Sequence, residues 1–99
     1  MQALNEHTML HRYWLVIYPG DPYCSKNIGV TAFSPQQARL LAKEEFKKIG
    51  WLHITDDSID QANIIEDIDI QLLDQNHIIT NMGLVTLQGV WYPNLNYGV

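Results

Sequence analysis

With 99 residues, a formal net charge of −5 and 46% hydrophobic residues, the chain has the composition of a folded domain, which excludes an intrinsically disordered protein. Its single cysteine, Cys24, excludes an internal disulfide and a zinc site built from several cysteines. The longest apolar run, residues 13–18, is much shorter than the roughly 20 residues that a membrane-spanning helix needs. No basic signal-peptide region precedes it. We therefore expect one cytoplasmic domain over residues 1–99, without a membrane partner.

The first predicted elements are two strands joined by a turn-rich loop. Residues 1–11 have a mixed composition and are expected to be partly flexible. Residues 13–18 form an aromatic and aliphatic run, typical of a central strand that is buried on both faces. The Pro-Gly-Asp-Pro segment at 19–22 is strong turn chemistry, because proline fixes φ and glycine permits positive φ. Alternating apolar side chains over 28–33 predict the second strand.

Residues 34–49 predict the main helix of the chain. Ser34 is a suitable N-cap, Pro35 suits the first helical position, and Gln37 completes a capping box. At about 100° per residue, one face of the helix is apolar and is expected to pack on the sheet. This face consists of Ala38, Leu41, Ala42, Phe46 and Ile49. Gly50 is well placed to end the helix.

Two residues, Glu45 and Leu40, depart from this amphipathic pattern. Glu45 interrupts the apolar face, and because burial of an isolated charge is costly, we expect it near an edge where its head reaches water. Leu40 falls on the opposite side. Arg39, Lys43 and Lys47 line another face, which is predicted to be solvated. Three cations on an acidic chain, without a recognition-helix motif, do not predict a nucleic-acid partner.

The chain after the main helix predicts shorter elements. Residues 51–54 are expected to form a short strand or a packed loop. Ser58 begins a second, weaker capping box, which predicts a short helix over 59–66. Two large aromatic residues, Trp14 and Trp51, are interpreted as core residues.

The last third of the chain predicts three strand segments. Alternation of apolar and polar residues predicts a strand over 68–73, with a hairpin partner at 77–80. A final strand is expected over 84–92, with a bulge at Gly89. Residues 94–99 are interpreted as an extended tail that is partly flexible.

These elements together predict an α+β fold. Strands that follow one another through short turns imply a mainly antiparallel sheet. A single amphipathic helix can bury its apolar face only against such a sheet. The expected architecture is therefore a small two-layer fold, with the main helix (34–49) packed on one face of the sheet.

The charges are unevenly distributed along the chain. Residues 1–50 hold all six Lys and Arg, whereas residues 51–99 hold seven Asp and Glu and no Lys or Arg. An acidic half favours a cationic partner, and the alternative interpretation is a solvated face that serves solubility alone. Trp91 and Tyr92 are adjacent in the last strand, so at least one is expected to lie outside the main core, where it would serve as an anchor, unless both faces of the sheet are covered. The predicted partner-binding residues are Trp91, Tyr92, Asp56, Asp57 and Asp60.

Two motifs contain residue types that bind metal ions, but neither motif predicts a metal site. His7 and His11 lie four residues apart beside Glu6, but the order differs from the zincin His-Glu-x-x-His motif and no third ligand has a telling spacing. Residues 56–67 partly resemble an EF-hand loop, yet Gln61 replaces the required glycine. The sequence therefore predicts no metal ligand, no cofactor and no catalytic residue.

The function that these patterns favour is that of a small intracellular binding or regulatory module. An immunity-like or antitoxin-like protein that binds a cationic partner is the leading form, and self-association is its variant. The alternative is a small cysteine- or metal-dependent enzyme or ligand-binding domain. In that case Lys26 would activate Cys24, with His53 or His77 as a base.

Overall fold

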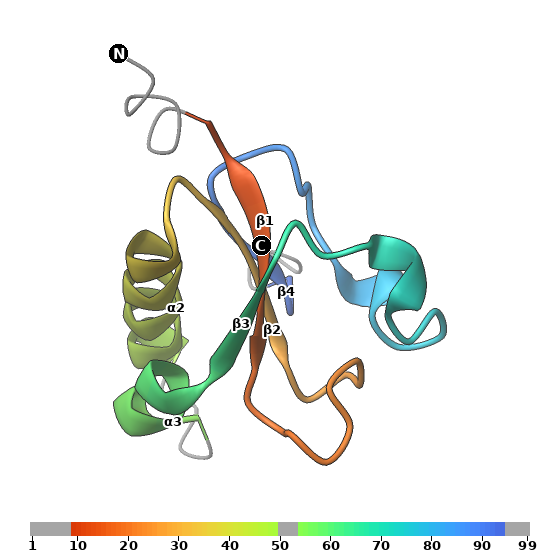
Figure 1. The fold of residues 1–99 in the computed structure, drawn as a ribbon, viewed down its shortest axis with the longest axis horizontal. Helices are drawn as coiled ribbons and strands as arrows, with labels where there is room; N and C mark the ends of the chain where they lie inside the picture. Colours follow the sequence, from red (N-terminus) through yellow and green to blue (C-terminus); the bar gives the residue numbers. More distant parts are fainter. Residues whose placement is uncertain (1–8, 50–53, 95–99) are drawn as a thin grey trace.

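The computed structural model describes residues 9–49 and 54–94 and confirms a small α+β fold with one main helix. Within these residues, four strands form one antiparallel sheet in the order β3-β1-β2-β4, so that β3 and β4 are its edges. The helices lie on one face of the sheet and the segment that links β3 to β4 lies on the other (Figure 1). The elements are β1 (His11–Val16), β2 (Ile28–Ala32), α2 (Pro35–Ile49), α3 (Asp56–Gln61), β3 (Asn63–Glu66), the 3-10 helices η2 (Ile70–Leu72) and η3 (Ile79–Asn81), and β4 (Gly89–Tyr92).

Strand β1 is central and buried on both faces, as its sequence predicts. Tyr13 and Leu15 belong to the core beneath the helices, and Trp14 and Val16 belong to the core on the opposite face. This division follows from the alternation of side chains along a strand. The strand begins at His11, earlier than predicted, so His11 belongs to the sheet rather than to a flexible terminus.

Helix α2 forms where its caps and apolar face predict it. The Ser34 Oγ accepts a hydrogen bond from the Gln37 N–H (3.1 Å), and the Gln37 Oε1 accepts one from the Phe33 N–H (2.8 Å). Ala38, Ala42 and Phe46 are buried against the sheet, whereas Leu40 is exposed on the far side. Gly50, the predicted end of the helix, lies outside the described residues, as does Trp51.

The short helix after α2 differs from its prediction because a different residue caps it. Thr55 is the N-cap of α3, and its Oγ1 accepts a hydrogen bond from the Ser58 N–H (3.1 Å). The helix therefore starts before Ser58, and the prediction of a helix over 59–66 is wrong. From Asn63 the chain is extended as β3, which lets Ile64 and Ile65 pack against opposite faces of the sheet.

The second face of the sheet is covered by residues 67–88 rather than by further strands. The predicted strand over 68–73 and its hairpin partner at 77–80 are wrong, because η2, turns and η3 occupy these positions. Local side-chain acceptors stabilise this course. The Asp69 carboxylate accepts a hydrogen bond from the Gln71 N–H (3.0 Å), and the Asp74 carboxylate accepts one from the Asn76 N–H (3.0 Å). Such bonds compete with a strand ladder and favour turns.

Strand β4 contains the predicted bulge, but at a different residue. Gly29 is opposite Tyr92 and Val30 is opposite Val90, so Trp91 is the extra residue. Its ring lies directly on Gly29, where an added Cβ would be 2.5 Å from the indole. Strand β4 itself is short, spanning Gly89–Tyr92 instead of 84–92.

Candidate functional site

Two of the residues predicted to bind a partner are buried in the core. Trp91 is 1% exposed and Tyr92 is 6% exposed, and both pack with Trp14 on the second face of the sheet. Neither residue lies outside the core, because both faces of the sheet are covered and the bulge lets the two adjacent side chains enter the same cluster. The Tyr92 hydroxyl donates a hydrogen bond to the Ser25 carbonyl oxygen (2.8 Å). Burial, opposed by this bond, raises the pKa of Tyr92.

The basic face of α2 holds α3 in place, which corrects the prediction of a solvated face. Arg39 Nη1 donates hydrogen bonds to three carbonyl oxygens at the end of α3: those of Ile59 (2.7 Å), Asp60 (3.0 Å) and Ala62 (2.8 Å). A cation is favourable there, because the C-terminal carbonyls of a helix carry partial negative charge. Lys43 adds an ion pair with the Asp60 carboxylate (2.8 Å), and this bond raises the pKa of Lys43.

A third basic side chain fixes the chain after β3. Arg12 Nε donates a hydrogen bond to the Ile68 carbonyl oxygen, and the Ile68 N–H donates one to the Arg12 carbonyl oxygen (both 3.2 Å). Lys26 is occupied differently, because its ammonium lies over the ring of Tyr18, 4.7 Å from the centroid. Cations of the first half thus contact backbone carbonyls of the second half, which leaves most of the carboxylates there directed to solvent.

Exposed acidic side chains of the second half lie before and after β3 along the chain. Asp56 and Asp57 are exposed in the first turn of α3, before the strand, and Glu66 and Asp67 are 55% and 58% exposed at its end. Among the described residues, no Lys or Arg forms an ion pair with these four carboxylates. We call β3 with Asp56, Asp57, Glu66 and Asp67 the acidic edge.

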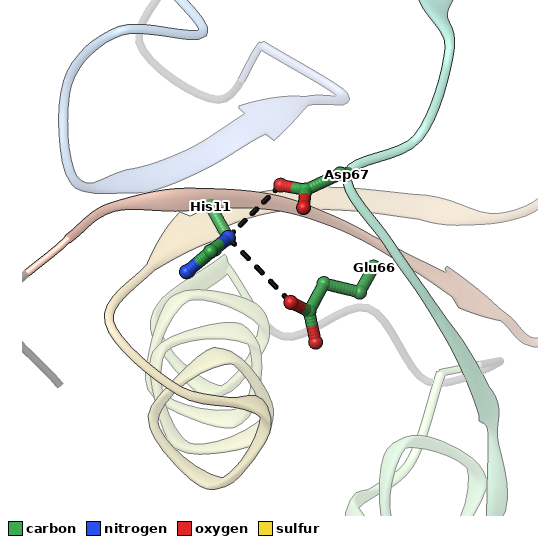
Figure 2. A group of neighbouring side chains, drawn as sticks. All are labelled: His11, Glu66 and Asp67. Atoms are coloured by element: carbon green, nitrogen blue, oxygen red, sulfur yellow. Dashed lines mark hydrogen bonds and ion pairs between the residues drawn. The ribbon is translucent and has the colours of Figure 1, made fainter. Parts of the chain in front are cut away.

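At one end of the acidic edge, two carboxylates converge on an imidazole (Figure 2). His11 Nδ1 lies 3.0 Å from Asp67 Oδ1 and 3.6 Å from Glu66 Oε2. The His11 side chain is only 20% exposed, and its ring packs on that of Tyr13 at a centroid distance of 5.9 Å. Burial, with a further contribution from the two carboxylates, raises the pKa of Tyr13. Together the three side chains offer one nitrogen and two oxygen ligands to a cation.

This cluster was missed from the sequence because its parts are far apart in the chain. The pairing of β1 with β3 brings His11 beside Glu66 and Asp67. In the sequence, the spacing of His11 relates it only to His7, which lies outside the described residues. Predicting the cluster would have required the register of β1 against β3, and no strand was predicted at the position of β3.

The groups proposed for cysteine chemistry lie apart from the acidic edge. Hydrogen bonds to the Cys24 sulfur come from amide groups, those of Lys26 (3.5 Å) and Asn27 (3.8 Å). His77 pairs with Asp74 (2.9 Å), and this bond lowers the pKa of the Asp74 carboxyl. His53 lies outside the described residues. No observed contact therefore joins Cys24 to a base within the described part of the chain.

Glu45 lies at the margin of the packed face, as predicted. Its side chain is 35% exposed and 3.5 Å from Lys48 Nζ. It lines a hollow of about 380 Å³ beside β4, together with the exposed Leu84 and Leu87. The Glu45 carboxylate therefore reaches solvent, as expected, and is not buried with a partner.

Comparison of the chain with models of known protein families, with curated proteins and with solved structures gave no match. Within residues 9–49 and 54–94, no helix has both the length and the apolar character needed to cross a bilayer.

Proposed function

We propose that this chain is a small protein-binding module whose acidic edge binds an extended, cationic segment of a partner protein. The observation that carries the proposal is the position of four exposed carboxylates that form no ion pair with Lys or Arg among the described residues. Asp56 and Asp57 precede the edge strand β3 in the chain, and Glu66 and Asp67 lie at its end. An edge strand offers free backbone donors and acceptors to an added strand, and the flanking charges select its sign.

The same charges disfavour self-association at this edge. Antiparallel pairing of two β3 strands would bring the α3 carboxylates of one copy towards Glu66 and Asp67 of the other. Like charges that face each other across a strand pair are destabilising. A cationic segment removes this repulsion and is therefore the favoured occupant. A basic toxin would have the required chemistry, and an immunity-like or antitoxin-like role stays a prediction.

The test uses a fluorescent peptide of alternating lysine and valine, titrated with the full chain at low salt. We expect saturable binding that weakens as salt is added, because exposed charges are screened. Replacing lysine by glutamate in the peptide is expected to abolish binding. A peptide of the same charge, N-methylated on alternate residues, is expected to bind poorly, because it lacks the amide donors for a strand ladder.

Matched variants locate the binding surface. The double change Asp56→Asn with Asp57→Asn is expected to weaken binding about threefold to tenfold, the range for two exposed charges. Glu44→Gln with Asp21→Asn removes the same charge away from β3 and is expected to leave binding unchanged. Equal losses in the two double variants, or equal binding of the N-methylated peptide, would refute docking at the acidic edge.

A further inference from the structure

We propose that His11, Glu66 and Asp67 form a binding site for a divalent transition-metal ion, with Zn²⁺ as the reference ion. The proposal does not depend on the proposed protein partner. It rests on the donor set and its geometry, since one imidazole and two carboxylates suit zinc and related ions. Their ligand atoms all lie within 4.8 Å of one another.

The two distances from His11 Nδ1 to the carboxylate oxygens are close to those between ligands of a metal ion. Ligands about 2.0–2.2 Å from a tetrahedral ion lie about 3.3–3.6 Å from one another. The observed separations from His11 Nδ1, 3.0 Å to Asp67 and 3.6 Å to Glu66, bracket this range. The shorter contact is also a hydrogen bond, whereas the 3.6 Å contact with Glu66 is too long for one and leaves that carboxylate oxygen available to an ion.

The scaffold holds two of the three ligands, His11 and Asp67, in place before an ion binds. Glu66 is directly opposite Tyr13 in the β1–β3 ladder, and the Tyr13 ring supports the His11 imidazole. Asp67 has φ of 55°, a left-handed backbone that turns its carboxylate back towards His11 at the end of the strand (Figure 2). The Glu66 side chain is exposed, so a rotation of its outer bonds can complete the coordination. Three protein ligands leave a position for water.

A second pair in the molecule provides an internal control. His77 and Asp74 have the same chemistry and nearly the same separation, 2.9 Å between Nδ1 and Oδ2. Within the described residues this pair has no third ligand, because only the cluster of His11, Glu66 and Asp67 satisfies the distance condition. A His–carboxylate pair with two ligands instead of three among the described residues is therefore available for comparison.

The experiment is a calorimetric titration of the full chain with zinc chloride, together with His11→Gln, Asp67→Asn and the control His77→Gln. Asparagine tolerates the left-handed backbone of Asp67, so that variant is expected to fold. We expect one zinc ion per chain, at least about tenfold weaker binding in His11→Gln and Asp67→Asn, and unchanged binding in His77→Gln. Circular dichroism without zinc checks that each variant is folded.

Three results would overturn the proposal. The first is a folded wild-type chain that takes up no zinc. The second is Asp67→Asn binding zinc as tightly as the wild type. The third is an equal loss in His77→Gln, which would indicate binding at scattered histidines. Loss in His7→Gln with no loss in Asp67→Asn would instead assign the ion to the His7 and His11 pair.

Discussion

The two halves of the chain are stabilised by different means. Residues 9–49 form a strand hairpin and a helix, which are joined by a regular backbone ladder and by an apolar helix face packed on the sheet. Residues 54–94 wrap around that unit, with α3 and β3 on one side and 3-10 turns on the other (Figure 1). Their course depends on side chains that bond to backbone, as with Asp69 and Asp74. The first half is a scaffold, and the second half supplies the acidic surface.

The charges show how the halves are joined. Arg12, Arg39 and Lys43 of the first half all bond to groups of the second half. Because Arg12 and Arg39 bond to carbonyl oxygens rather than to carboxylates, they attach the second half without neutralising it. The comparison therefore predicts that changes at the contact between the halves have the largest effects, and that changes within the turns have the smallest.

The largest effect is expected where β2 meets the core of the second face. In Gly29→Val the new side chain would occupy the space of the Trp91 indole, whose nearest atoms lie 2.5 Å from an added Cβ. We expect a loss of about 3 kcal/mol in the free energy of unfolding, measured by urea denaturation. Gly20→Ala is the control, because its nearest neighbour is 3.4 Å away, and little change is expected there. A loss below that of an ordinary surface substitution would show that Trp91 packs elsewhere.

An intermediate effect is expected at the contact between α2 and α3. Arg39→Ala leaves three carbonyl oxygens at the end of α3 without their charged donor. The expected loss is about 2–3 kcal/mol in urea denaturation, in line with hydrogen bonds to a charged group. Lys47→Ala, on the exposed part of the same helix, is the control and is expected to change little. Equal losses in both variants would contradict the docking role of Arg39, because alanine itself favours the helix and Lys47 makes no such contact with α3 among the described residues.

The smallest effect is expected within the turns of the second half, at Asp74. His77 lowers the pKa of the Asp74 carboxyl below 3.8, its value without the folded environment. A carboxyl whose pKa is lowered on folding stabilises the folded state at pH values above its pKa in the unfolded chain. This contribution is lost as the pH falls through the pKa of the carboxyl in the folded state. The difference in melting temperature between the wild type and Asp74→Asn should therefore shrink as the pH falls below 3.8.

The exposed Asp57 provides the control for this pH dependence. In Asp57→Asn the difference from the wild type should be smaller than for Asp74→Asn, because Asp57 has no hydrogen-bonded histidine among the described residues. A difference for Asp74→Asn that stays constant across the acid range would contradict the role of the His77 contact.

The features that could be predicted from the sequence are those that depend on near neighbours in the chain. The cap at Ser34 and the spacing of Ala38, Ala42 and Phe46 determine α2, and all lie within a few turns. β1 was predicted because its aromatic and aliphatic run is uninterrupted. The second face was not predicted, because the alternation after Ile68 resembles a strand while the carboxylates of Asp69 and Asp74 favour turns.

The candidate site was predicted only in part, for the same reason. Asp56 and Asp57 are exposed, as expected of carboxylates in a segment without Lys or Arg, and their role in partner binding stays a prediction. Trp91 and Tyr92 both lie in the core, because both faces of the sheet are covered and a bulge changes the alternation that the prediction assumed. The contact of His11 with Glu66 and Asp67 depends on strand pairing across more than half of the chain.

The central claim is that a cationic segment binds at the free edge of β3. Amide hydrogen exchange, followed by NMR with and without the lysine–valine peptide, tests it most directly. We predict slower exchange on peptide binding at amides within Asn63–Glu66, and unchanged exchange at Gly89–Tyr92 in the other edge strand. Protection confined to Gly89–Tyr92, or peptide binding without protection at either edge, would contradict the claim.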